Sequence, residues 1–448
     1  MIFEFEPAPG ASEICLPSTV GVSPGKTLIL RLGTARVTAR TTAGPATGAA
    51  MGTGAARRLG LSLPARLRAR WHPDRRTLRI GPVVGILVRK ARSQYGPFGP
   101  QAGFIRELMD AAGQLGVFLY AFGPGDVSWG RRRVRGYRYR GQGVWTRGLY
   151  PYPDVLWDRG FFRGAAQRRY WGTRMGLARA HRRMRFINAI YGNKWRVHRV
   201  LLRSPEVRPH LPETRRASSG RVVAAMARRH GTVYLKPAGG LKGRGIMRLE
   251  RVGQGRFRLR AGTRSRGGSL SRLAAIARRR GYLVQQGIDL ARPFGPIGDL
   301  RLVVQKDGAG NWSVTGGAMR VAATGHITSN IHRGGHAEPL DAAVRAVVGE
   351  GGYAATADLI SRVATGVARA VERASGPSGE MGVDLALDRE GRVWFLETNS
   401  KLARSIFLQL GETETRRRSI ERPLLWAARR SGFAVPEDER EASFRWPG

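Results

Sequence analysis

Continuous apolar runs and helical repeats alternate in the second quarter of the chain. Residues 83–88 (VVGILV) form an uninterrupted apolar run that is typical of a buried parallel strand. Residues 104–117 place apolar side chains at helical spacing, and 117–122 and 154–160 are two further apolar stretches. This alternation predicts a Rossmann-like α/β domain over 81–187. Its glycine loop does not match G-x-G-x-x-G, so no dinucleotide site is inferred.

The N-terminal region has a different pattern, in which short apolar stretches are separated by proline and glycine. Thr27–Leu32 is one such stretch, and Leu78–Ile80 closes the region. Residues 41–56 consist mostly of small residues and are expected to form a loop. We therefore predict a small β-rich module over 1–80. At the other end of the chain, 426–448 is charged and is expected to form a tail.

A strand followed by a glycine-rich loop is the first feature of chemical interest in the remaining region, 188–425. The segment 232–246 (TVYLKPAGGLKGRGI) leads from an apolar strand through Lys236 into four glycines and Lys242. Glycine lets backbone N–H groups approach a phosphate closely, and lysine adds positive charge. The loop does not match the Walker A pattern. By itself it fits a phosphate-binding loop or a flexible hairpin equally well.

Three oxygen-bearing side chains lie in two adjacent apolar strands near the C-terminal end. Residues 379–400 read as a hairpin with Asp384 on its first strand and Glu397 and Asn399 on its second. Residues two apart on a strand project to the same face, and the hairpin could place Asp384 beside them. Such an all-oxygen set suits Mg²⁺. The alternative is that the carboxylates face solvent on an exposed hairpin. However, the flanking residues are strongly apolar, so carboxylates among them need a reason.

Arginines occupy two apolar strands between these motifs. Within 298–335, Arg301 and Arg320 each lie in an otherwise apolar strand, and the segment also carries Asp299, Asn330, His332 and Arg333. The histidines of this segment have no Cys or Asp at ligand spacing, which disfavours a metal site there.

Two segments complete the set of candidate elements. Residues 282–288 (YLVQQGI) could present backbone groups to an adenine edge between Leu283 and Ile288, or could form an ordinary core strand. Asn193 opens a predicted helix that ends near Leu202.

Composition adds an excess of basic residues to this picture. The 448 residues include 77 Lys+Arg against 32 Asp+Glu, a formal net charge of +45. Seven of the basic residues are lysine, and so much arginine beside alanine and glycine fits a compositional bias better than selection for nucleic-acid binding. Non-specific attraction to polyanions is still expected. Because lysine is scarce, the placement of Lys194, Lys236 and Lys242 is informative.

Other compositional features exclude several classes of protein. With 42% hydrophobic residues, the chain is long enough for two or three domains and is not globally disordered. The single cysteine, Cys15, excludes an internal disulfide and a cysteine-based zinc site. The N-terminus lacks the features of a secretory signal, and no run of 18 apolar residues occurs. We therefore expect a cytoplasmic protein without a membrane span.

Taken together and in this order, the motifs resemble the ATP-grasp superfamily over roughly 188–410. NKW and LPET (193–195 and 211–214), the YLKP–glycine loop and the terminal ETNS strand are similar to the YheC/YheD group of endospore coat-associated proteins. The series DLR, AMR and NIHRGG also resembles amino-acid ligases of the ribosomal-protein glutamate-ligase type. The likeness extends into 82–187, where the family has a preceding α/β domain.

The resemblance implies an ATP-grasp fold, in which two α+β lobes grip ATP, behind a Rossmann-like pre-ATP-grasp domain. It also implies roles for individual residues. Asp384, Glu397 and Asn399 would bind one or two Mg²⁺, and Arg301, Arg320 and Asn330 would steady the phosphoryl group. The residues implied to contact ATP are Lys194, Lys236, Gly239, Gly240, Lys242, Gly243, Arg244, Gly245, Ile246, Gln285, Gln286 and Ile288. One departure is Gly382, where some ligases of this superfamily carry an arginine.

The activity implied is that of an ATP- and Mg²⁺-dependent carboxylate–amine ligase acting through an acyl phosphate. Its partners would be small-molecule or peptide carboxylates and amines, with spore-coat components as further partners. The alternative is a non-catalytic, ATP-binding protein of the spore surface that is structural or binds polyanions on an ATP-grasp scaffold, an interpretation based on the +45 charge and on RRRVRGYRYR (131–140).

Overall fold

The computed structural model describes residues 1–44, 48–91, 93–94, 96–239, 245–253, 256–261, 264–268, 281–326, 334–435 and 446. They form two compact units. Unit 1 combines 1–188, 306–311 and 420–442, and unit 2 combines 189–305, 312–419 and 443–448. The domain limits predicted at residues 80, 187 and 425 stay predictions.

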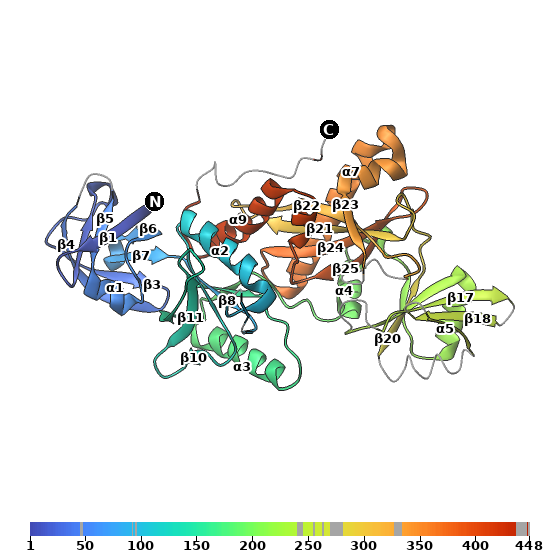
Figure 1. The fold of residues 1–448 in the computed structure, drawn as a ribbon, viewed down its shortest axis with the longest axis horizontal. Helices are drawn as coiled ribbons and strands as arrows, with labels where there is room; N and C mark the ends of the chain where they lie inside the picture. Colours follow the sequence, from blue (N-terminus) through green and yellow to red (C-terminus); the bar gives the residue numbers. More distant parts are fainter. Residues whose placement is uncertain are drawn as a thin grey trace. The chain divides into compact units, whose positions relative to one another are not determined.

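The N-terminal part of unit 1 is a closed barrel (Figure 1). Its strands follow the order β1-β5-β2-β4-β3-β7-β6, and their bounds are β1 Ile2–Ala8, β2 Glu13–Leu16, β3 Thr27–Leu32, β4 Ala35–Ala43, β5 Ala49–Gly52, β6 Ala65–His72 and β7 Thr77–Gly81. Alternate residues such as Leu28, Leu30 and Leu32 are buried inside. The expectation of a loop over 41–56 is wrong for most of its described residues, because this segment contains the end of β4, all of β5 and the start of helix α1 (Thr53–Leu59). Small residues are used here for close packing, since Ala55 and Ala56 are fully or almost fully buried.

The rest of unit 1 is built on a mixed sheet. Its strand order is β10-β11-β9-β8-β13-β14, and β12 pairs with β11. The bounds are β8 Val83–Leu87, β9 Phe118–Phe122, β10 Val127–Ser128, β11 Arg133–Tyr139, β12 Trp145–Pro151, β13 Val155–Asp158 and β14 Arg185–Phe186. In this sheet, β9, β8, β13 and β14 pair in parallel, and β10, β11 and β12 are joined by antiparallel pairings. The alternation predicted from residue 83 onwards is present, because helix α2 (Ala102–Gln114) connects the parallel neighbours β8 and β9. Helix α3 (Gly164–Ala180) follows β13, and the end of helix α9 (Thr413–Arg430) adds Leu424 and Trp426 to the core.

Unit 2 contains two antiparallel sheets. The first has the order β15-β20-β16-β17-β18-β19, with bounds β15 Thr214–Arg216, β16 Thr232–Pro237, β17 Met247–Gly253, β18 Arg256–Ala261, β19 Arg264–Gly268 and β20 Tyr282–Gln286. Helix α5 (Gly220–His230) packs against this sheet through Val223, Met226 and Ala227. The predicted strand before the glycine loop is β16.

The second sheet of unit 2 carries most of the polar motifs. Its order is β23-β22-β21-β24-β25, with bounds β21 Gly298–Lys306, β22 Trp312–Val321, β23 His336–Pro339, β24 Glu380–Leu387 and β25 Val393–Asn399. Helix α7 (Leu340–Ser375), which has a break at Gly349, packs against it together with α4 (Lys194–Leu201) (Figure 1). Helix α8 (Ser405–Gln409) lies beyond β25, and short 3-10 helices occupy Ser18–Val20, Pro73–Arg75, Gly99–Gln101 and Arg208–His210.

Candidate active site

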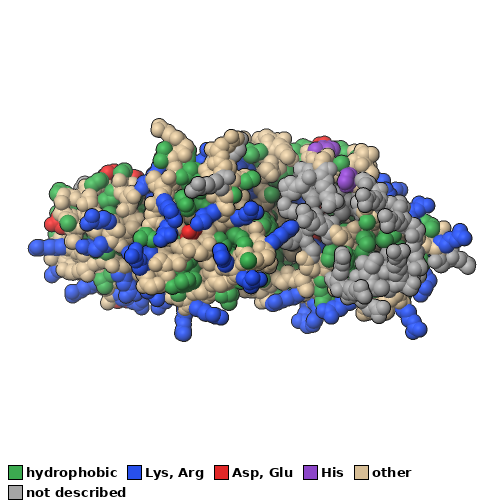
Figure 2. Space-filling model, turned by 60° about the horizontal axis from the view of Figure 1, so that its bottom comes forward, with side chains coloured by type: hydrophobic (Ala, Val, Ile, Leu, Met, Phe, Trp, Pro, Cys, Tyr) green, Lys and Arg blue, Asp and Glu red, His purple; other side chains and the backbone are tan. Residues whose placement is uncertain are grey.

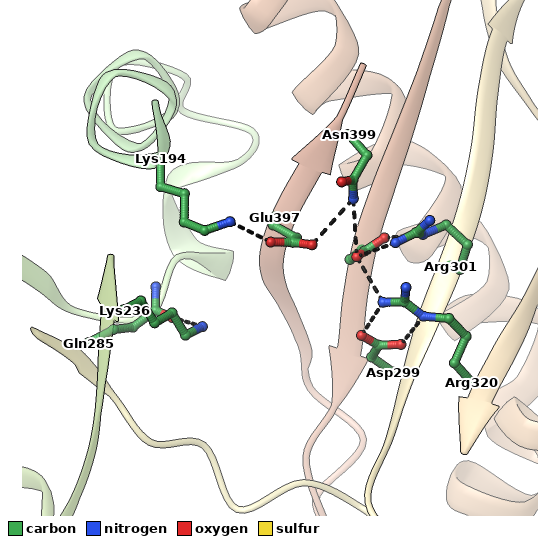
Figure 3. Close-up of polar contacts among 9 residues, drawn as sticks. Lys194, Lys236, Gln285, Asp299, Arg301, Arg320, Glu397 and Asn399 are labelled. Carbon is green, nitrogen blue, oxygen red and sulfur yellow. Dashed lines mark hydrogen bonds and ion pairs between the residues drawn. The ribbon is translucent and has the colours of Figure 1, made fainter. Parts of the chain in front are cut away.

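The β24–β25 hairpin brings the three predicted oxygen-bearing side chains together (Figure 3). Asp384 is directly opposite Glu397, and a bulge follows Asp384 in the register of the two strands. Asn399 Nδ2 lies 3.3 Å from Asp384 Oδ2 and 3.4 Å from Glu397 Oε1. The strand period of two therefore places Glu397 and Asn399 on one face, as the sequence predicted.

Two arginines from neighbouring strands converge on Asp384 (Figure 3). Arg301 of β21 is paired in register with Asp384 and holds both carboxylate oxygens, with Nη2 donating to Oδ2 at 2.8 Å. Arg320 of β22 donates from Nη2 to the same Oδ2, also at 2.8 Å. Arg320 donates from Nε to Asp299 Oδ1 at 2.7 Å. Asp299 is thus a member of the site that was not among the predicted site residues, although its position in an apolar strand was a signal for it.

Burial and the two arginines have opposite effects on these carboxylates. Burial would raise the pKa of Asp384, which is 1% exposed, but Arg301 and Arg320 outweigh it and lower the pKa to about 2. Burial raises the pKa of Asp299, because Arg320 offsets only part of it and the charge of Asp384 adds to it. The pKa of Arg320 is raised, since Asp299 and Asp384 outweigh the effect of burial. Asp384 is consequently ionised at neutral pH.

Two lysines face this carboxylate cluster from other elements (Figure 3). Lys194, the first residue of α4, donates from Nζ to Glu397 Oε2 at 2.6 Å. Its backbone N–H donates to the carbonyl of Ala238 at 3.0 Å, which ties the start of the helix to the start of the glycine loop. Lys236 of β16 donates from Nζ to Gln285 Oε1 at 2.5 Å. Burial lowers the pKa of Lys236 to about 8, with Glu397 opposing and Lys194 adding to the shift.

The site carries more positive than negative charge. Among the described residues of the site, four side chains are basic (Lys194, Lys236, Arg301 and Arg320) and three are carboxylates (Asp299, Asp384 and Glu397). An excess of cationic N–H donors around a partly exposed cluster favours an anionic ligand such as a phosphate chain.

The structure describes only some of the other predicted site residues. Gly239, Gly245 and Ile246 flank the glycine loop, and the carbonyl of Gly245 accepts a hydrogen bond from the Tyr282 hydroxyl at 2.9 Å. Gly240, Lys242, Gly243, Arg244 and Asn330 lie outside the described residues.

The predicted adenine strand is β20, which lies between β15 and β16 and so pairs on both sides. Gln285 is used as a side chain, because its Nε2 also donates to Thr214 Oγ1 at 2.9 Å. The backbone of Gln286 donates to the carbonyl of Glu213 at 2.8 Å, and Ile288 lies beyond the last paired residue. Contacts of adenine with Gln285, Gln286 and Ile288 stay a prediction. Of these three residues, Ile288 is the one outside the paired part of the strand.

Gly382 has no room for the arginine that some ligases carry at this position. A Cβ atom on Gly382 would lie 2.6 Å from Leu402 Cδ2 and 3.3 Å from Asn399 Cβ. Leu402 is 1% exposed, so it is not free to move aside. Among the described residues, the arginines that contact Asp384 come instead from β21 and β22.

The donor set fits a hard cation held jointly by protein and phosphate. No group of three His, Cys, Asp or Glu side chains able to hold a metal occurs among the described residues. Asp384, Glu397 and Asn399 supply two carboxylates and one amide, and Mg²⁺ commonly takes one or two carboxylates with the remaining ligands from water and phosphate. Asn399 faces the carboxylates with its NH₂ group, so the amide would have to turn over to offer its oxygen to a metal beside them.

The fold and this site define an ATP-grasp protein, and the chain belongs to the YheC/D-like ATP-grasp family. The model of that family matches residues 183–429, more than half of the chain. The match covers every described residue of the site, from Lys194 to Asn399.

Two curated relatives come from Bacillus subtilis (strain 168). The chain is 29% identical over 388 residues to the endospore coat-associated protein YheD, covering 81% of this chain and 82% of that protein. It is 24% identical over 321 residues to the endospore coat-associated protein YheC, covering 69% of this chain and 87% of that protein.

Solved structures similar to the chain include two ligases. D-alanyl-alanine synthetase A from Vibrio cholerae is 11% identical with a TM-score of 0.44, covering 77% of this chain and 99% of that chain. The VanG D-Ala:D-Ser ligase from Enterococcus faecalis is 11% identical with a TM-score of 0.46, covering 78% and 99%. Within the part of the chain that the structure describes, no helix is both long and apolar enough to cross a membrane.

Proposed function

We propose that the protein is an ATP- and Mg²⁺-dependent carboxylate–amine ligase that works through an acyl phosphate. The observation that carries the proposal is the face formed by Asp384, Glu397 and Asn399, with Lys194 and Lys236 in front of it (Figure 3). Oxygen ligands for a cation and cationic donors for phosphate are thereby combined in one site. Phosphoryl transfer requires this combination of positioning and charge neutralisation.

The reaction has two steps with a simple balance of atoms. A carboxylate oxygen of the substrate attacks the γ-phosphorus of ATP, so that a new O–P bond forms and the bond to ADP breaks. An amine then attacks the acyl carbon, expels inorganic phosphate and loses a proton, which leaves an amide. Mg²⁺ held by Asp384, Glu397 and Asn399 would supply charge neutralisation at the phosphates.

The side chains of this protein would bind and orient the reactants. Lys194 and Lys236 would contact phosphate oxygens, with Lys194 exchanging its contact to Glu397 for one to the ligand. Arg301 and Arg320 hold Asp384, and each guanidinium has five N–H groups, so both keep donors for the transferred phosphoryl group. Asn330 is proposed for the same task from the family pattern alone.

The names of the relatives suggest where such an activity would be used. YheC and YheD are named endospore coat-associated proteins. We propose that this protein acts in the cytoplasm on spore-coat components, with a peptide or small-molecule carboxylate as the acid.

The test is a turnover assay with Mg·ATP, pooled amino acids and candidate carboxylates. We expect ADP release that depends on the acid, a new product mass, and a hydroxamate when hydroxylamine replaces the amine. Glu397→Gln should abolish all three signals. Glu390→Gln, an exposed carboxylate in the turn of the same hairpin, is the matched control and should keep them. Equal activity in both variants would refute the site.

The net charge of the chain supports a second candidate function. With a net charge of +45, an ATP-grasp scaffold could bind ATP and a polyanionic surface without turnover. Saturable Mg·ATP binding with no ADP formed across broad substrate pools would support this function and refute the ligase.

A further inference from the structure

Arginines lie side by side in register on the outer face of the N-terminal barrel. Arg31 of β3 is directly opposite Arg36 of β4 on one side and Arg79 of β7 on the other. Arg79 is in turn opposite Arg70 of β6. Because Leu30 and Leu32 point inward, Arg31 points outward. Like charges directly opposite each other destabilise a sheet. Arg70 and Arg79 each donate to a carbonyl after α9, at 2.6 Å to Gly432 and 2.8 Å to Ser431, whereas Arg31 and Arg36 make no such contact among the described residues.

Two cavities lie along this row of arginines. Their volumes are about 400 and about 440 Å³, and both are lined by Arg31, Arg36 and Arg183. Arg132 and His181 add to the lining of the first cavity, and Arg79 and His72 to that of the second. No Asp or Glu is among the described residues that line either cavity. Both are open to solvent, and their volumes lie within the range of sites for small molecules.

A buried histidine in the first cavity has a free ring nitrogen. His181 is 9% exposed, and its Nε2 has no hydrogen-bond partner among the described residues. His72 Nε2, in the second cavity, is in the same situation. Leaving a buried polar atom unpaired costs free energy, which a ligand that reaches the atom would recover.

The positive charge of these cavities is poorly balanced within unit 1. The side chains of Arg36 and Arg183 make no hydrogen bond or ion pair with another described residue. Two described carboxylates lie near the row. Asp154 lies 3.5 Å from Arg79 while also accepting from the backbone of Val83 at 3.0 Å, and Asp74 lies 3.2 Å from Arg75, with both side chains of that pair exposed. Basic side chains are spread over the face drawn in Figure 2 with few acidic ones between them, so abundance alone marks no site. The row of arginines differs from the other basic residues because its members are aligned in register beside the two cavities.

We propose that this arginine-lined surface of unit 1 binds a small molecule that carries several phosphate groups. Guanidinium groups match phosphate oxygens in pairs, and several of them converging without carboxylates call for a ligand with several negative charges. The site belongs to unit 1, whereas the ATP site described above consists of unit 2 residues, so the two can be tested separately.

The test uses inorganic tripolyphosphate as the probe in calorimetric titrations of the full chain at physiological salt without Mg²⁺. The titrations are made in a Lys194→Gln, Lys236→Gln background, because the candidate active site is itself expected to take a phosphate chain. In that background we expect a saturable site with one tripolyphosphate per chain. The double variant Arg36→Gln, Arg183→Gln should weaken its Kd by about tenfold or more. The control Arg168→Gln, Arg169→Gln removes the same charge from exposed positions of α3 that line neither cavity, and should change Kd by less than about twofold.

Other outcomes would overturn the proposal. Equal weakening in the two double variants would mean general charge attraction, and absence of saturable binding would mean that there is no site. A Kd for citrate as low as that for tripolyphosphate would refute a preference for phosphate. Because the removed side chains crowd like charges, we expect the cavity variant to melt no lower than the wild type without anion, and Arg183→Gln alone gives a second folded variant.

Discussion

Replacing Asp384 with asparagine tests how the arginines hold the centre of the candidate active site. Asparagine has nearly the same shape but no charge, so Arg301 loses its carboxylate partner and Arg320 keeps only Asp299. The structure lowers the pKa of Asp384 from an ordinary 3.8 to about 2. A difference of one in pKa corresponds to about 1.4 kcal/mol, so the charged form contributes about 2 kcal/mol to folding.

The contribution of Asp384 to stability should also depend on pH, which can be measured. Because the pKa is lower in the folded state, the stabilisation is present above about pH 4 and is lost as the pH falls towards 2. For a unit of this size, about 2 kcal/mol corresponds to a decrease in Tm of about 4–8 °C at neutral pH. Asp384→Asn should therefore melt lower than the wild type at pH 7, and the difference should shrink at acid pH.

The assay is calorimetric melting without Mg²⁺ or ATP, with Asp289→Asn as the matched control. Asp289 lies 3.0 Å from Arg389, but both side chains are more than 60% exposed, so the same change there should cost less than about 1 kcal/mol. An unchanged Tm for Asp384→Asn, or shifts of the same size in both variants, would refute the claim that Asp384 is a stabilising member of the cluster.

Two further predictions concern other charged groups of unit 2. The pKa of Lys236 is lowered to about 8, so the affinity for Mg·ATP should fall as the pH rises from 7 to 9. Lys236→Arg should remove this pH dependence, because arginine stays charged. A fall of equal size in the arginine variant would exclude Lys236 as the origin of the pH dependence. Arg404 and Glu380 form a fully buried ion pair, so Arg404→Met should destabilise the protein by about 3–5 kcal/mol in denaturant melts. The double variant Arg404→Met, Glu380→Leu should lose less than the single one, and a larger loss in the double variant would contradict this account.

The hairpin of the site could be predicted from sequence because its information is local. A strand period of two and an apolar flank are enough to place Glu397 and Asn399 on one face, and the turn after Asp384 brings the third side chain beside them. The order of elements around residue 83 followed from the same kind of local pattern. Such features depend on neighbours in the chain and not on the tertiary fold.

The charge pairing inside the site could not be predicted in the same way. Asp299, Arg320 and Asp384 are far apart in sequence, and nothing in a chain rich in arginine indicates which arginine holds which carboxylate. The loop expected over 41–56 failed for a related reason. The run of small residues predicted a loop, whereas Ala55 and Ala56 are small because the barrel leaves them little space.

The division of unit 1 among three chain segments has a consequence for biosynthesis. Its sheet over β8, β9 and β13 is complete in sequence by Asp158, yet Leu424 and Trp426 of its core come from α9. A ribosome adding about 5–20 residues per second needs roughly 10–50 s to synthesise the chain between 188 and 420. During that interval an apolar surface of the nascent chain lacks its final cover, so a truncation before α9 should leave a product that depends on chaperones.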